Sequence, residues 1–227
     1  PGDINNSYAT GNVSGGGQVG GLVGLNDGTD GGERGEGGSS YGTISNSYAR
    51  GVASGGAATG GRVGLNGSYG EIVNSRWDTG TAATGVGANL DGVIANVGGL
   101  DGAQFTTIDS FGGWNIDAFG GSGTTWRIYE GHTAPLLRGF LAPLTIAGAN
   151  ATRVYNGSAD GPINIADPKI LGTVSTPSKN VGVYDFSIDG LYSTQFGYDL
   201  SEGEGTLTIT PLPRAAMRLI TASIGNT

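Results

Sequence analysis

The chain contains no cysteine, a single histidine and a single methionine among its 227 residues, and only 13% of the residues are charged. The absence of cysteine excludes a disulfide framework, a thiol nucleophile and a cysteine-ligated zinc site. Lysine and arginine number 11 against 19 acidic residues, and they are scattered singly. We expect neither nucleic-acid binding nor attachment to anionic membranes, because both need clustered positive charge. No apolar run approaches the ~20 residues of a membrane span, so we expect no membrane insertion.

Glycine, by contrast, is abundant. The 47 glycines argue against a helical fold, because a glycine inside a helix costs about 1 kcal/mol relative to alanine. Disorder is also disfavoured, since 37% of the residues are hydrophobic and 8% are aromatic. The apolar residues come in short stretches between glycine pairs, which is typical of short strands. The composition therefore predicts an all-β chain.

Two short sequence motifs repeat in the first part of the chain. Residues 4–11, INNSYATG, recur at 44–51 as ISNSYARG and, in degraded form, at 72–80. The motif GGLVGLN at 20–26 returns at 60–66 as GGRVGLN. The repeating unit is therefore about 28 residues long. The first copy carries about a dozen further residues, roughly 30–42, which have no apolar anchor and which we interpret as an inserted loop.

A unit of this length, with several short strands and glycine at its bends, favours a parallel β-helix. Asn6, Asn46 and Asn74 occupy the same point of the unit. We expect them to form a ladder at one corner, because asparagine tolerates the left-handed conformation and its amide can bond to the next copy. Arg62 and Arg76 interrupt the repeated pattern with charge, and we expect them at the edge of a copy or facing solvent.

These motifs resemble the GLUG repeat of large secreted adhesins, the filamentous-haemagglutinin-like exoproteins of Gram-negative bacteria, and of some cell-surface proteases. The segments NSRWDT at 74–79, SFGGW at 110–114 and WRIYEGHTAPLLR at 126–138 look like the stretch that closes the GLUG region in such adhesins. The resemblance covers residues 3–141 and implies a parallel β-helix with an aromatic closing segment.

From about residue 142 the composition changes. Glycine thins out, and alternating Val, Ile, Thr and Tyr predict strands with one face in water. The motifs VYNG at 154–157 and GTLTI at 205–209 resemble the small β-grasp or Ig-like MBG/YDG modules that follow GLUG regions. We therefore expect a β-helix at 1–141, a β module at 142–211, and at 212–227 the start of a further module or a tail.

The resemblance implies a fragment of an adhesin secreted to the surface of a Gram-negative bacterium by two-partner secretion, with an outer-membrane transporter as its partner during export. Its binding partners would be a host-cell surface protein, a glycan or a biofilm polysaccharide, contacted by exposed loops on a rigid stalk. Two alternatives stay open: the non-catalytic region of a GLUG-containing cell-surface protease, and a structural spacer. We expect no enzymatic activity and no cofactor.

The insert concentrates carboxylates among glycines. Four of them are weak candidates for calcium ligands: Asp27, Asp30, Glu33 and Glu36. Carboxylate oxygens are the ligands that Ca²⁺ prefers, but the spacing matches neither the EF-hand nor the glycine-rich calcium repeat. We therefore interpret the insert as a solvated loop.

Aromatic residues gather between positions 77 and 129. Weak candidates for a carbohydrate-binding platform are Trp77, Trp114, Trp126 and Tyr129. The interpretation that we favour is a buried cap over the end of the β-helix, because an uncapped end exposes strand edges.

The remaining motifs indicate no chemistry. His132 is the only side chain that ordinarily titrates near neutrality, and it lies in a predicted turn before Pro135. Residues 15–20 satisfy G-x-G-x-x-G and residues 38–42 satisfy G-x-S-x-G, but no strand-helix unit surrounds either motif. We expect no catalytic residue and no metal site.

Overall fold

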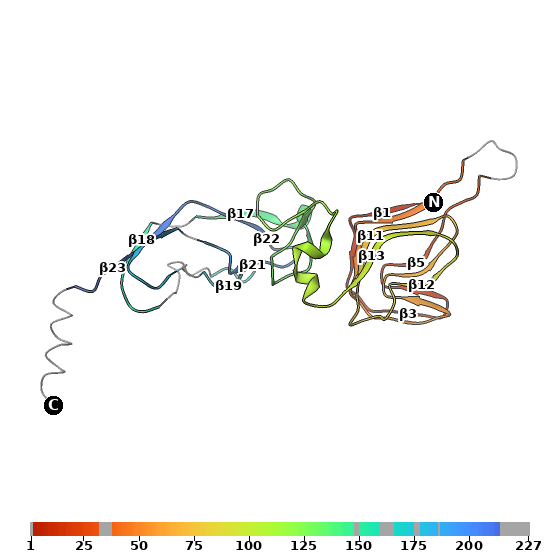
Figure 1. The fold of residues 1–227 in the computed structure, drawn as a ribbon, viewed down its shortest axis with the longest axis horizontal. Coiled ribbons are helices and arrows are strands. Elements are labelled where there is room, and N and C mark those ends of the chain that lie inside the picture. The colour runs from red at the N-terminus through yellow and green to blue at the C-terminus, as the bar shows by residue number, and fades with distance from the viewer. Residues whose placement is uncertain are drawn as a thin grey trace, which may run out of the picture. The chain divides into compact units, whose positions relative to one another are not determined.

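The computed structural model describes residues 2–31, 38–147, 150–158, 166–174, 178–185 and 187–213. Over these residues the chain is almost all β, as predicted, and its helical segments are short 3-10 turns. The chain divides into two compact units: Pro1–Ala118 with Thr124–Leu137, and Phe119–Gly123 with Arg138–Thr227. Figure 1 shows the chain as a ribbon, coloured from red at the N-terminus to blue at the C-terminus.

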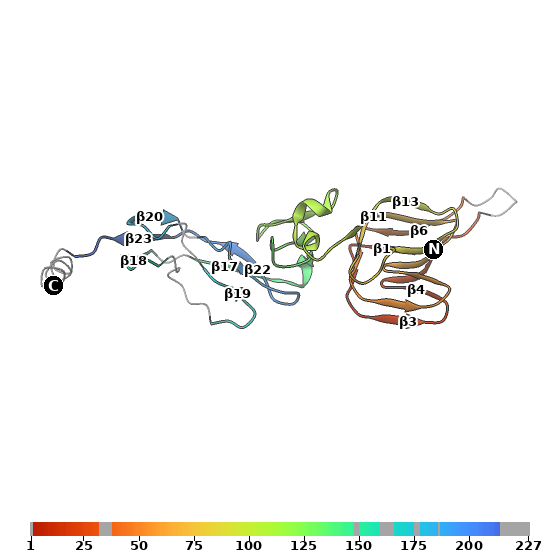
Figure 2. The same ribbon diagram turned by 60° about the horizontal axis from the view of Figure 1, so that its bottom comes forward.

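The first unit contains a curled parallel sheet built from successive copies of the repeat. Copy 1 runs over residues 3–26, copy 2 over 42–66 and copy 3 over 70–89. A fourth, shorter copy follows at 93–100. The copies stack beside one another in Figure 2. The largest sheet has the order β1 (Asp3–Asn5), β6 (Gly42–Ser45), β11 (Gly70–Asp78), β7 (Tyr48–Ala49) and β2 (Tyr8–Ala9), with β13 (Val93–Leu100) also on β11.

The remaining strands of the copies pair in the same parallel way. A three-stranded sheet joins β5 (Val23–Asn26), β10 (Val63–Asn66) and β12 (Val86–Asn89). Two-stranded pairs join β3 (Val13–Gly15) to β8 (Ala53–Gly55) and β4 (Gln18–Gly20) to β9 (Ala58–Gly60).

The strand pairing aligns identical or similar residues of successive copies. One column consists of Ile4, Ile44, Ile72 and Ile94. A second column consists of Val23, Val63 and Val86. The inner members are fully buried, since Ile44, Ile72 and Val63 are at most 1% exposed and pack into one core. The repeated apolar residues therefore form the interior between copies, which explains why the pattern recurs.

The corner asparagines adopt the predicted left-handed conformation. The φ angles of Asn6, Asn46 and Asn74 are 48°, 46° and 46°, and Asn96 of the fourth copy has 52°. The amide ladder is only partly formed. Asn96 Nδ2 donates to Asn74 Oδ1 at 2.6 Å, whereas Asn46 Nδ2 donates to Asn5 Oδ1 at 3.3 Å.

This conformation gives a direct prediction at Asn46. Replacing it with alanine should cost about 1 kcal/mol more than replacing it with glycine, because a left-handed backbone penalises a Cβ. The neighbouring Ser45 lies in strand β6 and is the matched control, where glycine should cost more than alanine. Denaturant unfolding of the four variants measures both differences. The same order at both positions would contradict the left-handed corner.

Arg62 and Arg76 are buried, so the prediction that they lie at an edge or face solvent is wrong. Arg62 is 0% exposed and Arg76 is 7% exposed. The register explains Arg62, because it stacks on Leu22, an interior residue of copy 1. Arg76 is held at the corner by carbonyl oxygens, which accept from its guanidinium: those of Ser75, Asn96 and Ser110.

The aromatic closing segment packs on the side of the copies. It contains η1 (Gln104–Thr106), η2 (Ile108–Phe111), β14 (Ile116–Asp117), β15 (Trp126–Arg127) and β16 (Leu136–Leu137). Trp126 Nε1 donates to Asn6 Oδ1 of copy 1 at 3.1 Å, and Trp114 Nε1 donates to the Asn74 carbonyl of copy 3 at 2.7 Å.

The segment does not cap the end of the stack as predicted. Its core also includes Tyr48 of copy 2 and Leu100 of the fourth copy, so its contacts reach every copy. At the start of β13, by contrast, Val93 and Ile94 stay 47% and 43% exposed. The reason is that Tyr8 and Tyr48 project from the corner and stack on each other, with ring centroids 5.2 Å apart. Trp114 and Trp126 pack against these two rings, along the side of the stacked copies.

The described residues of the second unit form three small sheets. Parallel pairing joins β17 (Ala142–Ile146) to β22 (Tyr198–Glu202) and β18 (Ala151–Val154) to β23 (Thr206–Thr210). Antiparallel pairing joins β20 (Gly182–Asp185) to β23 and β19 (Leu171–Gly172) to β21 (Leu191–Tyr192). Alternation along β23 buries Leu207 and Ile209 and leaves the threonines half-exposed. Residues 214–227, most of the predicted further module or tail, lie outside the described residues.

A buried ion pair fixes the start of this unit. Arg138, in η3 (Arg138–Phe140), lies with its Nη1 2.5 Å from Asp199 Oδ2, and both side chains are nearly covered. The same carboxylate oxygen accepts from the Gly121 backbone N–H at 3.0 Å. Asp199 thus ties residues 119–123 to the sheet formed by β17 and β22.

Candidate contact surface

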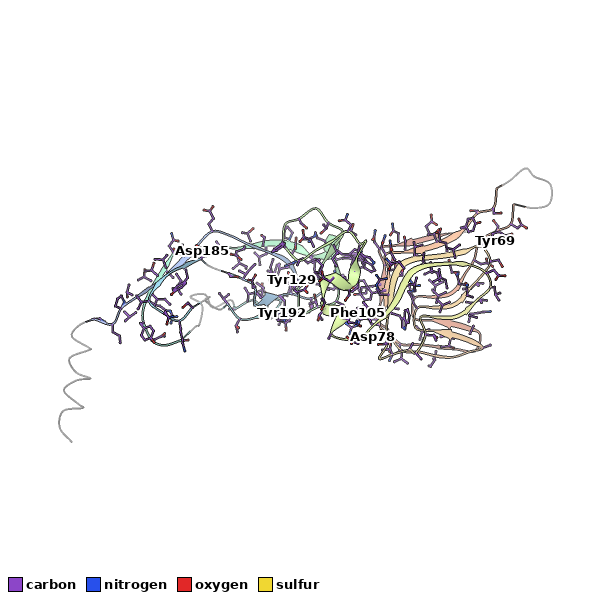
Figure 3. The ribbon with its side chains drawn as sticks, in the orientation of Figure 1. Tyr69, Asp78, Phe105, Tyr129, Asp185 and Tyr192 are labelled. Carbon is purple, nitrogen blue, oxygen red and sulfur yellow. The ribbon has the colours of Figure 1, made fainter. Side chains whose placement is uncertain are left out.

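Trp114, Trp126 and Tyr129, three of the candidates for a carbohydrate platform, are buried. Trp126 is 0% exposed, Trp114 is 7% exposed and Tyr129 is 4% exposed. The ring centroids of Trp114 and Trp126 lie 5.1 Å apart, and the Arg127 guanidinium covers the Tyr129 ring at 4.1 Å. Phe105 and Tyr129 mark this cluster in Figure 3. Because the ring faces are occupied, the cluster serves packing and offers no platform to a ligand.

Trp77 lies in a cradle of glycines inside the copies. It pairs with Ala49 of copy 2 and with Gly99 of the fourth copy. A Cβ on Gly85 would come within 2.3 Å of the ring, and a Cβ on Gly99 within 2.8 Å. Its Nε1 donates to the Ala82 carbonyl at 3.2 Å. The large ring thus fills space that the glycines leave open, and it is half-buried.

The base of the insert presents one exposed and one half-buried tyrosine instead. Tyr41 is 48% exposed, and its ring centroid lies 6.0 Å from that of the half-buried Tyr69. Thr29 and Ser40 close the base with an antiparallel bridge, in which each backbone N–H donates to the other's carbonyl. Tyr69 lies beside the segment that leads into the insert (Figure 3). We call Tyr41, Tyr69, Asp27 and Asp30 the insert base.

The two aspartates of the insert base hold this arrangement. Asp27 Oδ1 accepts from the backbone N–H of Gly28 at 2.8 Å and from that of Tyr69 at 3.1 Å. Desolvation, together with the charge and hydrogen bond of Asp30, raises the pKa of Tyr69 above its usual value. The phenol is protonated at neutral pH, as tyrosine ordinarily is, and can donate to Asp30 or to a ligand.

The calcium prediction is not decided by these contacts. Asp27 and Asp30 lie at the insert base and use their oxygens on local N–H and O–H donors. Glu33 and Glu36 lie outside the described residues. Within the described part of the chain, no three His, Asp or Glu side chains come together as a metal site.

The other motifs lie where the sequence placed them. His132 is exposed in a turn, where its backbone N–H donates to the Tyr129 carbonyl at 2.9 Å. Residues 15–20 run from the last residue of β3 through the whole of β4, and Ser40 of the G-x-S-x-G motif belongs to the bridge at the insert base, just before β6. No helix follows either motif in the described chain, whereas phosphate binding and a nucleophile elbow require a turn from a strand into a helix.

An exposed aromatic pair in the second unit was not predicted. Phe140 and Phe196 are 58% and 69% exposed, and their rings meet edge to face at 5.8 Å. Phe196 has a φ of 68°, which is uncommon for a bulky residue. Phe196 lies in a turn in which the Gly197 backbone N–H donates to the Thr194 carbonyl at 2.9 Å, and nothing in the sequence distinguishes these rings from core phenylalanines.

The comparisons with known proteins identify no relative. No family model, no curated protein and no solved structure matches the chain. Among the described residues, no helix has the length and apolar character needed to cross a membrane. The GLUG and MBG/YDG resemblances therefore remain predictions.

Proposed function

We propose that the chain is part of a secreted bacterial adhesin, in which the repeat copies form a parallel β-helix stalk and the insert base contacts the ligand. The observation that carries this proposal is the columns of like residues through successive copies. Such columns let a chain extend by repetition, because each copy buries its apolar residues against the next. The GLUG-like motifs supply the family context, with export by two-partner secretion through an outer-membrane transporter.

The side chains of the insert base are suited to binding a ligand. Exposed tyrosine rings bury apolar area at low entropic cost and offer a hydroxyl group. Asp27 and Asp30 place carboxylate acceptors next to these rings. Rings beside acceptors suit the C–H faces and hydroxyls of a glycan, such as one on a host cell or in a biofilm matrix. A host protein rich in polar side chains would use the same groups.

Two other functions fit the same stalk. A spacer would use the stacked copies for reach alone, and the non-catalytic region of a cell-surface protease would use them to position another domain. Neither needs the insert base. The insert base therefore separates the adhesin from both alternatives.

The test is binding of the purified chain to mucin, to a glycan array and to host cells. Replacing Tyr41 and Tyr69 together with alanine should weaken binding at least about tenfold, which is about 1.4 kcal/mol. Val13→Ala is the matched control, since Val13 is 39% exposed in the same unit and lies in β3, which pairs with β8 and contains no residue of the insert base. Equal binding by the tyrosine variant would place the contact elsewhere, and an absence of binding in every assay would favour the spacer.

A further inference from the structure

Arg62 lies in the interior of the stacked copies. Its backbone carbonyl accepts from Leu22 of copy 1 at 2.9 Å, and its backbone N–H donates to Gly85 of copy 3 at 3.0 Å. It is therefore enclosed by a copy on each side. The side chain is 0% exposed, which makes it one of the largest fully buried side chains of the described residues.

The guanidinium of Arg62 has no hydrogen-bond partner among the described residues. Its Nε, Nη1 and Nη2 are all buried and unpaired. Other arginines of the first unit are paired: Arg50 Nε lies 3.0 Å from Asp78 Oδ2, and Arg76 donates to three carbonyls. Arg62 is thus a set of buried donors without an acceptor, an arrangement that folded proteins avoid.

The electrostatic surroundings of Arg62 add to this cost. Burial and, secondarily, the like charge of Arg76 lower the pKa of Arg62 to about 9. The group still carries its proton at neutral pH, because this value lies above 7. A buried charge without compensation is strongly unfavourable. The interior therefore contains positive charge that needs a counter-charge.

We propose that a small monovalent anion of chloride size binds the Arg62 guanidinium inside the stacked copies. Water could accept the hydrogen bonds, but it would leave the charge uncompensated. The neighbouring core is apolar, because Leu22, whose backbone N–H donates to the Arg62 carbonyl, packs against Ile44, Val63 and Ile72. Such walls favour a weakly hydrated monovalent ion over sulfate or phosphate, whose charge and hydration are larger.

The experiment refolds the full chain from denaturant in sodium gluconate, sodium chloride or sodium bromide at one ionic strength, removes the denaturant and then unfolds the chain by heating. Tryptophan fluorescence follows the first unit alone, since all three tryptophans lie in it. Chloride and bromide should raise the unfolding midpoint saturably, by about 5 °C over gluconate. Arg62→Leu, which restores the leucine of copy 1, should remove this dependence and should be more stable than the parent chain in gluconate.

Lys179→Met is the matched control, because it removes one positive charge at an exposed position of the second unit. It should keep the full dependence on chloride. Crystals of the parent chain grown in bromide should show an anomalous peak beside Arg62, which decides the question even if Arg62→Leu fails to fold. Equal midpoints in chloride and gluconate, or a bromide crystal with no peak at Arg62, would overturn the proposal.

Discussion

Replacing Trp126 with alanine should destabilise the first unit by about 3–5 kcal/mol, the usual cost of removing a fully buried tryptophan. The ring lies within 6.5 Å of three other aromatic rings, with centroid distances of 6.4 Å to Tyr8, 5.9 Å to Tyr48 and 5.1 Å to Trp114. The substitution also removes the hydrogen bond to Asn6 of copy 1. The free energy of unfolding, measured by fluorescence of the two remaining tryptophans, gives the effect.

Two further variants make the Trp126 result specific. Trp126→Phe keeps a ring in place and should lose much less than alanine does. Leu90→Ala changes a residue that is 54% exposed in the same unit, and it should shift stability by less than about 1 kcal/mol. If Trp126→Ala unfolded as the parent chain does, the aromatic segment would be an independent layer rather than a side wall of the copies.

Asn66→Ala should destabilise the first unit by about 2–4 kcal/mol, because it breaks the centre of a buried ladder. Asn66 is 0% exposed, accepts from Asn26 Nδ2 at 2.9 Å and donates to Asn89 Oδ1 at 2.8 Å. Its loss leaves a donor of Asn26 and an acceptor of Asn89 unpaired. Equilibrium unfolding in urea measures the cost.

Asn66→Asp sharpens this test through pH. An ionised carboxylate can accept from Asn26 but cannot donate to Asn89, and burial disfavours its charge. Protonation restores a donor, so the variant should regain stability as the pH falls from 7 towards 4. Asn12→Asp is the control, since exposed Asn12 only accepts, from the Val52 N–H at 3.0 Å. It should stay near the parent stability throughout, and equal pH profiles for the two variants would argue against the ladder.

The repeat could be predicted because asparagine, which tolerates an unusual backbone conformation, recurs at the same point of each copy. Asparagine at one corner of each copy predicted the left-handed conformation that Asn6, Asn46 and Asn74 adopt. The motif does not predict the fourth copy, because Ala95, Asn96 and Val97 keep the asparagine but lose the serine and tyrosine.

The buried arginines and the position of the aromatic segment could not be predicted in the same way. Charge indicates exposure on average, and only the stacking register reveals that Arg62 replaces an interior leucine. The side contact of Trp114 and Trp126 depends on how Tyr8 and Tyr48 project from the corner. Likewise, Tyr41 and Tyr69 are far apart in sequence, and only the stacking of the copies brings their rings together.

The stacking of the copies in register is tested most directly by engineered cysteine pairs, since the chain contains no cysteine. Thr43 pairs with Glu71, so their Cα atoms should lie about 4.8 Å apart, within the range of a disulfide. Asp3 lies one copy further from Glu71, at about 9.6 Å, beyond that range. The Thr43→Cys, Glu71→Cys chain should form its disulfide readily in the folded state, and the Asp3→Cys, Glu71→Cys chain should not. Equal yields, or cross-linking of the second pair alone, would contradict the stack.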